Sequence, residues 1–92
     1  MEEVKLDLDL LGQLTDDLTP IPDMALLLDV DEGALRIALS DRDTEAWRVY
    51  HRHKALAARI VRRRNIELAQ AGSPTAAAAV NDYLTTMSLE ES

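Results

Sequence analysis

The side chains best suited to chemistry in this chain are arginines gathered in one stretch. Residues 48–64, RVYHRHKALAARIVRRR, hold seven of the ten Lys and Arg residues and no Asp or Glu. The rest is acidic, because residues 1–47 carry thirteen carboxylates against three bases and residues 65–92 carry four against none. A guanidinium stays charged and matches the geometry of phosphate oxygens. The block therefore either binds a polyanion or is a solvated helix face neutralised by acidic neighbours.

Other side chains give little support for catalysis. His51 and His53 stand two residues apart, which points them to different sides of a helix and makes them ordinary surface histidines, not a metal pair. The carboxylate pairs at 16–17 and 41–43 are typical of helix caps and loops. No glycine-rich phosphate loop followed by Lys and Ser or Thr is present. We therefore expect no enzyme, no cofactor and no metal site.

Size and composition predict one small helical domain. We place it at residues 1–88, with an acidic tail at 89–92. The apolar residues are almost all aliphatic, with no Phe and one Trp, which favours helices. The chain has no Cys, and it begins with acidic residues instead of a basic stretch and an apolar run. We therefore expect a cytoplasmic protein without a signal peptide or a membrane segment.

Capping residues predict a helix-turn-helix at about 19–40. Thr19 would cap a short helix that begins at Pro20, and Asp31 would cap a second one. Between them, Asp29 stands where a glycine is usual, and Asp tolerates left-handed backbone better than most residues. The spacing fits a helix-turn-helix. Two short helices of any small bundle would give the same pattern.

The flanking segments complete an all-α prediction. Residues 4–14 alternate as in a strand but also keep helical spacing, and nothing else in the chain could pair with a strand, so we expect a helix. A long basic amphipathic helix should run over about 44–71 and end at Gly72. Ser73 would then cap a C-terminal alanine-rich helix over about 74–87. The expected fold is a trihelical N-terminal half followed by these two helices.

Plotted at about 100° per residue, the long helix separates its residue types. The apolar face, expected to pack against the C-terminal helix, holds Val49, Tyr50, Leu56, Ala57, Ile60, Val61 and Leu68. The opposite face is an arginine stripe of Arg48, Arg52, Arg59, Arg62 and Arg63. Arg64 falls within the apolar face, where we expect a structural ion pair or an extended side chain.

The predicted recognition helix is a poor reader of bases. It exposes Glu32 and Arg36 and follows two Asp residues, so its surroundings are negative, whereas phosphate contacts need Lys and Arg. If DNA binds, the arginine stripe must supply most of the attraction. The predicted DNA-binding residues are Arg36, Arg48, Arg52, Arg59, Arg62 and Arg63.

Residues 18–84 resemble the helix-turn-helix small terminase subunits of tailed phages and prophages. The resemblance is carried by LTPIPDMALLLDVDEGALRIAL, by YHRHK and by RRRNIELAQAGSPTAAAAVNDYL, of which ELAQAGSPTA is the most telling part. Such proteins tend to have a glycine before the lysine, where this chain has His53. The resemblance implies a protein of the bacterial host cytoplasm that binds double-stranded viral DNA, assembles as a ring and regulates the large terminase subunit.

The residues themselves leave two other functions open. A helix-turn-helix transcriptional regulator is one, although the acidic recognition helix disfavours it. The other is an assembly module that never binds DNA, in which the acidic half of one subunit meets the arginine stripe of another. In either case a modest core, an alanine-rich helix and segregated charge favour a homo-oligomer.

Overall fold

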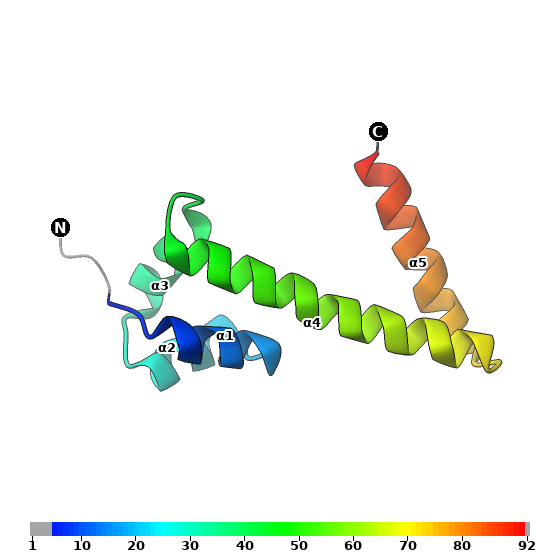
Figure 1. Cartoon of the computed structure of the whole chain (residues 1–92), viewed down its shortest axis with the longest axis horizontal. Coiled ribbons are helices and arrows are strands. Elements are labelled where there is room, and N and C mark those ends of the chain that lie inside the picture. Colours follow the sequence, from blue (N-terminus) through cyan, green and yellow to red (C-terminus); the bar gives the residue numbers. More distant parts are fainter. Residues whose placement is uncertain (1–4, 92) are drawn as a thin grey trace. The chain divides into compact units, whose positions relative to one another are not determined.

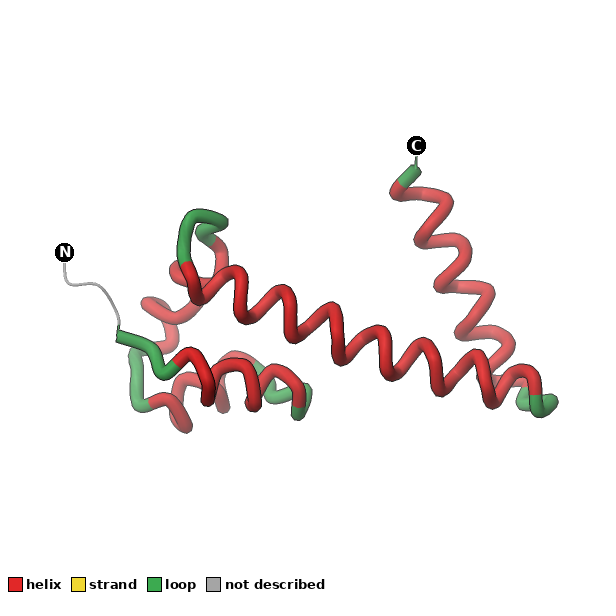
Figure 2. Tube along the Cα trace, in the orientation of Figure 1, coloured by secondary structure: helices red, strands yellow, loops and turns green. Residues whose placement is uncertain are grey.

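The computed structural model describes residues 5–91, and within that range the chain is all-α, with helices joined by short turns and no strand (Figures 1 and 2). The helices are α1 (Leu8–Asp16), α2 (Ile21–Leu28), α3 (Glu32–Ser40), α4 (Glu45–Gln70) and α5 (Pro74–Glu90). The predicted fold class is confirmed. The chain divides within α4 into an N-terminal unit that ends at Ala57 and a C-terminal unit that begins at Ala58.

The first segment contains a helix, as predicted, but the helix begins at Leu8; residues 5–7 are not helical, and residue 4 lies outside the described residues. Asp7 caps this helix, and its side chain accepts a hydrogen bond from the Leu10 backbone N–H at 3.0 Å. The helix ends with Leu18 in the left-handed region at φ 59°. The next N–H, that of Thr19, donates to the Leu14 carbonyl at 3.0 Å and closes the end of α1.

The prediction that Thr19 caps the second helix is therefore wrong. Pro20 occupies the N-cap position with extended backbone, and no side chain caps α2. The physical reason is that the Thr19 backbone already belongs to the C-terminal motif of α1. Pro20 was predicted as the first helical residue, but α2 begins one residue later, at Ile21. The position of Pro22 within the first turn of α2 costs nothing, because the N–H groups there have no helical partner.

The turn between α2 and α3 is formed by residues 29–31, where the capping residues predicted it. Asp29 adopts the left-handed conformation at φ 55°, and the Val30 N–H donates to the Ala25 carbonyl at 3.0 Å, which ends α2. Asp31 then caps α3 by accepting from the Ala34 N–H at 2.9 Å. The largest fully buried side chains, which hold α1, α2 and α3 together, are apolar: Leu11, Met24 and Leu35.

The N-terminal turns of α4 complete the N-terminal unit. Thr44 caps the helix, because its Oγ1 accepts from the Trp47 N–H at 3.0 Å. Ala46 joins the buried cluster, with Val49 and Tyr50 half-buried against it. On the same unit, the His53 ring lies against Gly12 of α1, so close that a Cβ there would be 2.9 Å from the ring.

The C-terminal unit joins the end of α4 to α5 through a tight turn. Gly72 has φ 101°, and Ser73 caps α5 by accepting from the Ala76 N–H at 3.2 Å. Both were predicted. The helix then continues to Glu90, past the predicted end near 87, so the start of the predicted acidic tail is helical; residue 92 lies outside the described residues.

The face of α4 that meets α5 differs from the predicted one. Within the C-terminal unit, the half-buried positions of α4 are Ala58, Asn65, Ile66 and Ala69, and those of α5 follow Ala76 at helical spacing. The predicted core residues Ile60, Val61 and Leu68 are instead 71%, 44% and 37% exposed. In the N-terminal unit, Leu56 is also 40% exposed, whereas Ala57 is buried as predicted. After the connection at residues 71–73, α5 returns along the side of α4 that holds Asn65. A helical wheel of α4 alone does not contain the direction of this return.

Candidate nucleic-acid interface

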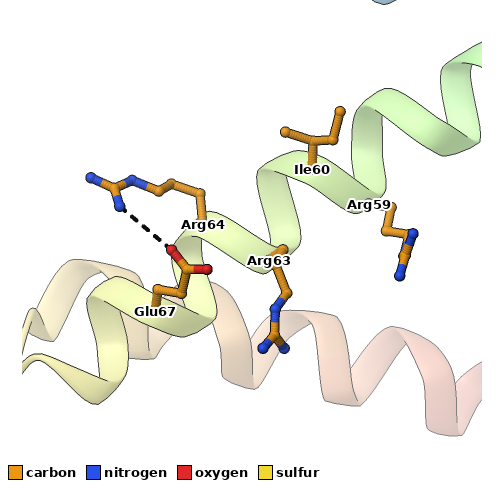
Figure 3. A pocket seen from close by; sticks show the side chains of 5 residues that line it. All are labelled: Arg59, Ile60, Arg63, Arg64 and Glu67. Atoms are coloured by element: carbon orange, nitrogen blue, oxygen red, sulfur yellow. Dashed lines mark ion pairs between the residues drawn. The ribbon is translucent and has the colours of Figure 1, made fainter.

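Two arginines of the C-terminal unit combine exposure with freedom from an acidic partner. Arg59 and Arg63 are one helical turn apart on α4, and both are exposed. Figure 3 shows both side chains beside Ile60 on the same part of α4. Neither has an ion pair with any residue in the part of the chain that the structure describes. Their charges are therefore available to an external anion.

These arginines line one side of an open depression of about 390 Å³ on α4. Its other lining residues are Ile60, Arg64 and Glu67 (Figure 3). Arg64 Nη1 lies 3.5 Å from Glu67 Oε2, so one of the three guanidinium groups has a carboxylate beside it. An ion pair was one of the two roles predicted for Arg64, but the two side chains are 69% and 51% exposed, so this pair lies on the surface and not within an apolar face. Three positive charges against one negative charge leave the depression with a net charge of +2.

Arg62 is held by α5. Its guanidinium lies over the Tyr83 ring, 5.6 Å from the ring centroid, and Asn65 Nδ2 donates to the Tyr83 hydroxyl at 2.7 Å. The charge of Arg62 remains, but its position serves the α4–α5 contact. Arg62 can therefore add to the positive electrostatic potential of this surface, but its side chain is less free than Arg59 or Arg63 to move toward a bound anion.

The predicted DNA-binding residues of the N-terminal unit differ in the same way. Arg36 Nε lies 3.1 Å from Glu32 Oε2 on α3, and Arg48 Nη1 lies 3.1 Å from Glu45 Oε1 on α4. Arg52 is exposed and has no ion pair among the described residues. The structure thus brings together Arg59, Arg62 and Arg63 in one unit, places Arg48 and Arg52 on α4 in the other, and leaves Arg36 on α3 with its own carboxylate.

The two histidines were misread from the sequence. Both are half-buried and each bonds another helix: His53 Nδ1 lies 2.8 Å from Asp16 Oδ1, and His51 Nε2 lies 3.3 Å from the Leu39 carbonyl. The Trp47 ring stacks beside His51 with centroids 4.4 Å apart. These side chains are structural ties within the N-terminal unit. The glycine at position 12 was the available signal, because a helical glycine often marks a close neighbour.

Among residues 5–91, no group of three or more His, Cys, Asp or Glu side chains is arranged to hold a metal ion. None of the described helices combines the length and the apolar character that crossing a membrane requires. No protein-family model matches the chain, and no curated protein or solved structure shows significant similarity to it. The resemblance to small terminase subunits gains no support from these comparisons, and it stays a prediction.

Proposed function

We propose that the protein binds double-stranded DNA through phosphate contacts made chiefly by Arg59 and Arg63, as a small terminase subunit-like protein of a phage or prophage would. The observation that carries the proposal is the exposure of these two arginines, one turn apart and without a carboxylate partner among residues 5–91. A paired arginine must exchange an existing contact for a phosphate, whereas an unpaired one does not.

The charge distribution decides where DNA can bind. The chain has a formal net charge of −7, so DNA is repelled by most of its surface. Residues 58–70 are the opposite, with four arginines against one glutamate. Phosphate binding is therefore favourable only near this part of α4, and Arg52 adds a further free charge on the same helix.

The structure favours non-specific binding over reading of bases. The one basic side chain of α3, Arg36, is tied to Glu32 on the same helix. The turn before α3 contributes Asp29 and Asp31, whose charge opposes entry of this helix into a DNA groove. A transcriptional regulator that recognises a sequence through α3 is accordingly the less favoured function.

Two matched double variants test the proposal. Arg59→Gln with Arg63→Gln removes two free charges, and Arg36→Gln with Arg48→Gln removes two charges that already have carboxylate partners. Both lower the net charge by two, so only direct phosphate contact distinguishes them. Binding to a fluorescent duplex would be measured by anisotropy over a range of salt concentrations.

The first pair should reduce the slope of log affinity against log salt by about 2, at about 0.9 per lost phosphate contact, and the second pair by clearly less. Equal effects of the two pairs, or no binding by the parent protein at low salt, would refute the proposal. The more specific packaging role has its own test, which is co-purification of the protein with the large terminase subunit encoded in the same genome.

A further inference from the structure

The depression on α4 contains an aliphatic side chain that phosphate contacts do not use. Ile60 lines the depression and is 71% exposed. The charged lining residues are Arg59, Arg63, Arg64 and Glu67. Ile60 precedes Arg63 by three residues and Arg64 by four, so these side chains are neighbours on the helix surface (Figure 3). A phosphate gains nothing from an isoleucine, whereas a ligand with both anionic and apolar groups gains from the whole set.

Packing between α4 and α5 does not explain the position of Ile60. Within the C-terminal unit, α4 meets α5 on the side that holds Asn65, whose Nδ2 donates to the Tyr83 hydroxyl at 2.7 Å. Ile66 is half-buried in this unit, whereas Ile60 is exposed. The side chain of Ile60 is therefore accessible to an external ligand.

We infer that the depression also binds an acidic segment of another protein, in which aliphatic and carboxylate side chains lie close together. An aliphatic side chain of the segment packs on Ile60, and its carboxylates pair with Arg59 and Arg63, which have no ion pair among residues 5–91. The net charge of +2 on the lining residues favours an acidic partner. Glu67 repels a carboxylate placed opposite it, so a mixed acidic and aliphatic segment fits better than a continuous run of carboxylates.

The segment uses the same two arginines as the proposed phosphate contacts, so it competes with DNA. This competition rests on the proposed function, whereas the binding of the segment does not. Ile60 distinguishes the two ligands, because it adds to the affinity for the segment and not to the affinity for DNA. A partner protein with such a segment would regulate when this part of α4 is open to DNA.

The test compares two short fluorescent peptides at low salt. The first alternates Asp and Leu, and the second has Gln in place of each Leu. The two peptides carry the same charge, so the aliphatic contact alone distinguishes them. The protein variants are Ile60→Ser and a matched control, Leu84→Ser on α5, which is 55% exposed and lies outside the depression. Both replaced side chains are exposed, so each variant should keep the helical circular dichroism of the parent.

The parent and Leu84→Ser should bind the Asp–Leu peptide about tenfold more tightly than the Asp–Gln peptide. Ile60→Ser should remove this difference and leave the affinity for duplex DNA unchanged. The double variant Arg59→Gln with Arg63→Gln should weaken the binding of both peptides. The Asp–Leu peptide should displace a fluorescent duplex from the parent.

Equal affinity of the parent for the two peptides would overturn the inference, and so would an Ile60→Ser variant that keeps the difference. Sedimentation velocity tests a second copy of the chain as the occupant. A parent oligomer that Ile60→Ser dissociates and Leu84→Ser does not would overturn the inference in favour of that occupant. A parent that selects the Asp–Leu peptide but binds no duplex would support the inference and refute the proposed DNA binding.

Discussion

Replacing Gly12 by alanine probes the contact between α1 and α4 most directly. Gly12 is in the middle of α1, where alanine is favoured over glycine by about 1 kcal/mol of helix propensity. A Cβ at this position would, however, stand 2.9 Å from Cε1 and Nε2 of His53, well inside ordinary carbon contact distance. The ring would have to move, although its Nδ1 is held 2.8 Å from Asp16 Oδ1.

The magnitude follows from these opposing effects. Displacing the ring removes the His53–Asp16 hydrogen bond, worth about 0.5–1.5 kcal/mol, and the lower part of that range applies because Asp16 is 51% exposed. This loss offsets about half of the gain in propensity, so Gly12→Ala in the parent should raise the free energy of unfolding by only about 0.5 kcal/mol. In a His53→Ala background the space is open, and the same substitution should stabilise by about 1 kcal/mol.

The assay is a double-mutant cycle in urea. Trp47 is the single tryptophan of the chain and lies in the N-terminal unit, so its fluorescence reports unfolding of that unit. Gly33→Ala serves as the control, because a Cβ there would meet only Asp31, and its effect should be the same in both backgrounds. If Gly12→Ala stabilises both backgrounds by the same amount, the coupling is zero and the contact inferred between Gly12 and His53 does not act in solution.

Two further predictions concern stability. Leu18→Gly should stabilise the N-terminal unit by about 1 kcal/mol. Leu18 adopts φ 59° and is 65% exposed, so glycine relieves the left-handed backbone strain with little loss of buried surface. An unchanged or lower free energy of unfolding in urea would contradict this. Leu35→Ala should cost about 2–5 kcal/mol because Leu35 is 0% exposed, whereas Ile60→Ala, at 71% exposure, should change the stability of the monomer by less than about 0.5 kcal/mol. Thermal unfolding at low protein concentration, below the range of self-association, would compare the two, and a similar loss for both would show that Ile60 is core after all.

Some of the ion pairs that the arginines form could be predicted from the sequence, and one could not. Arg36 and Arg48 have a glutamate four and three residues before them, so their ion pairs could be expected from helical spacing. Glu67 stands four residues after Arg63 and three after Arg64, which left either pairing open, and the structure pairs it with Arg64. The freedom of Arg63, on which the proposed function depends, was therefore decided by side-chain geometry within one turn of helix.

The sequence by itself determined the helices and most of their ends. Asp31 and Ser73 each cap a helix, as predicted, by accepting a hydrogen bond from a backbone N–H three residues later, and Gly72 supplies a left-handed residue where a helix stops. Asp7 caps α1 in the same way, although the predicted helix began before it. Such interactions span only a few residues, so residue type and spacing suffice to predict them. The all-α class follows from the same local preferences.

Only the tertiary structure decided which side of each helix is covered. The direction in which α5 returns after residues 71–73 selects Ile66 and leaves Ile60 exposed, although both are aliphatic residues of one helix. The tie between His53 and Asp16 joins residues 37 apart, and Thr19 was taken into the end of α1 by a backbone bond to Leu14. These outcomes depend on the free energy of packing whole elements against each other, to which residue type and helical period contribute only in part.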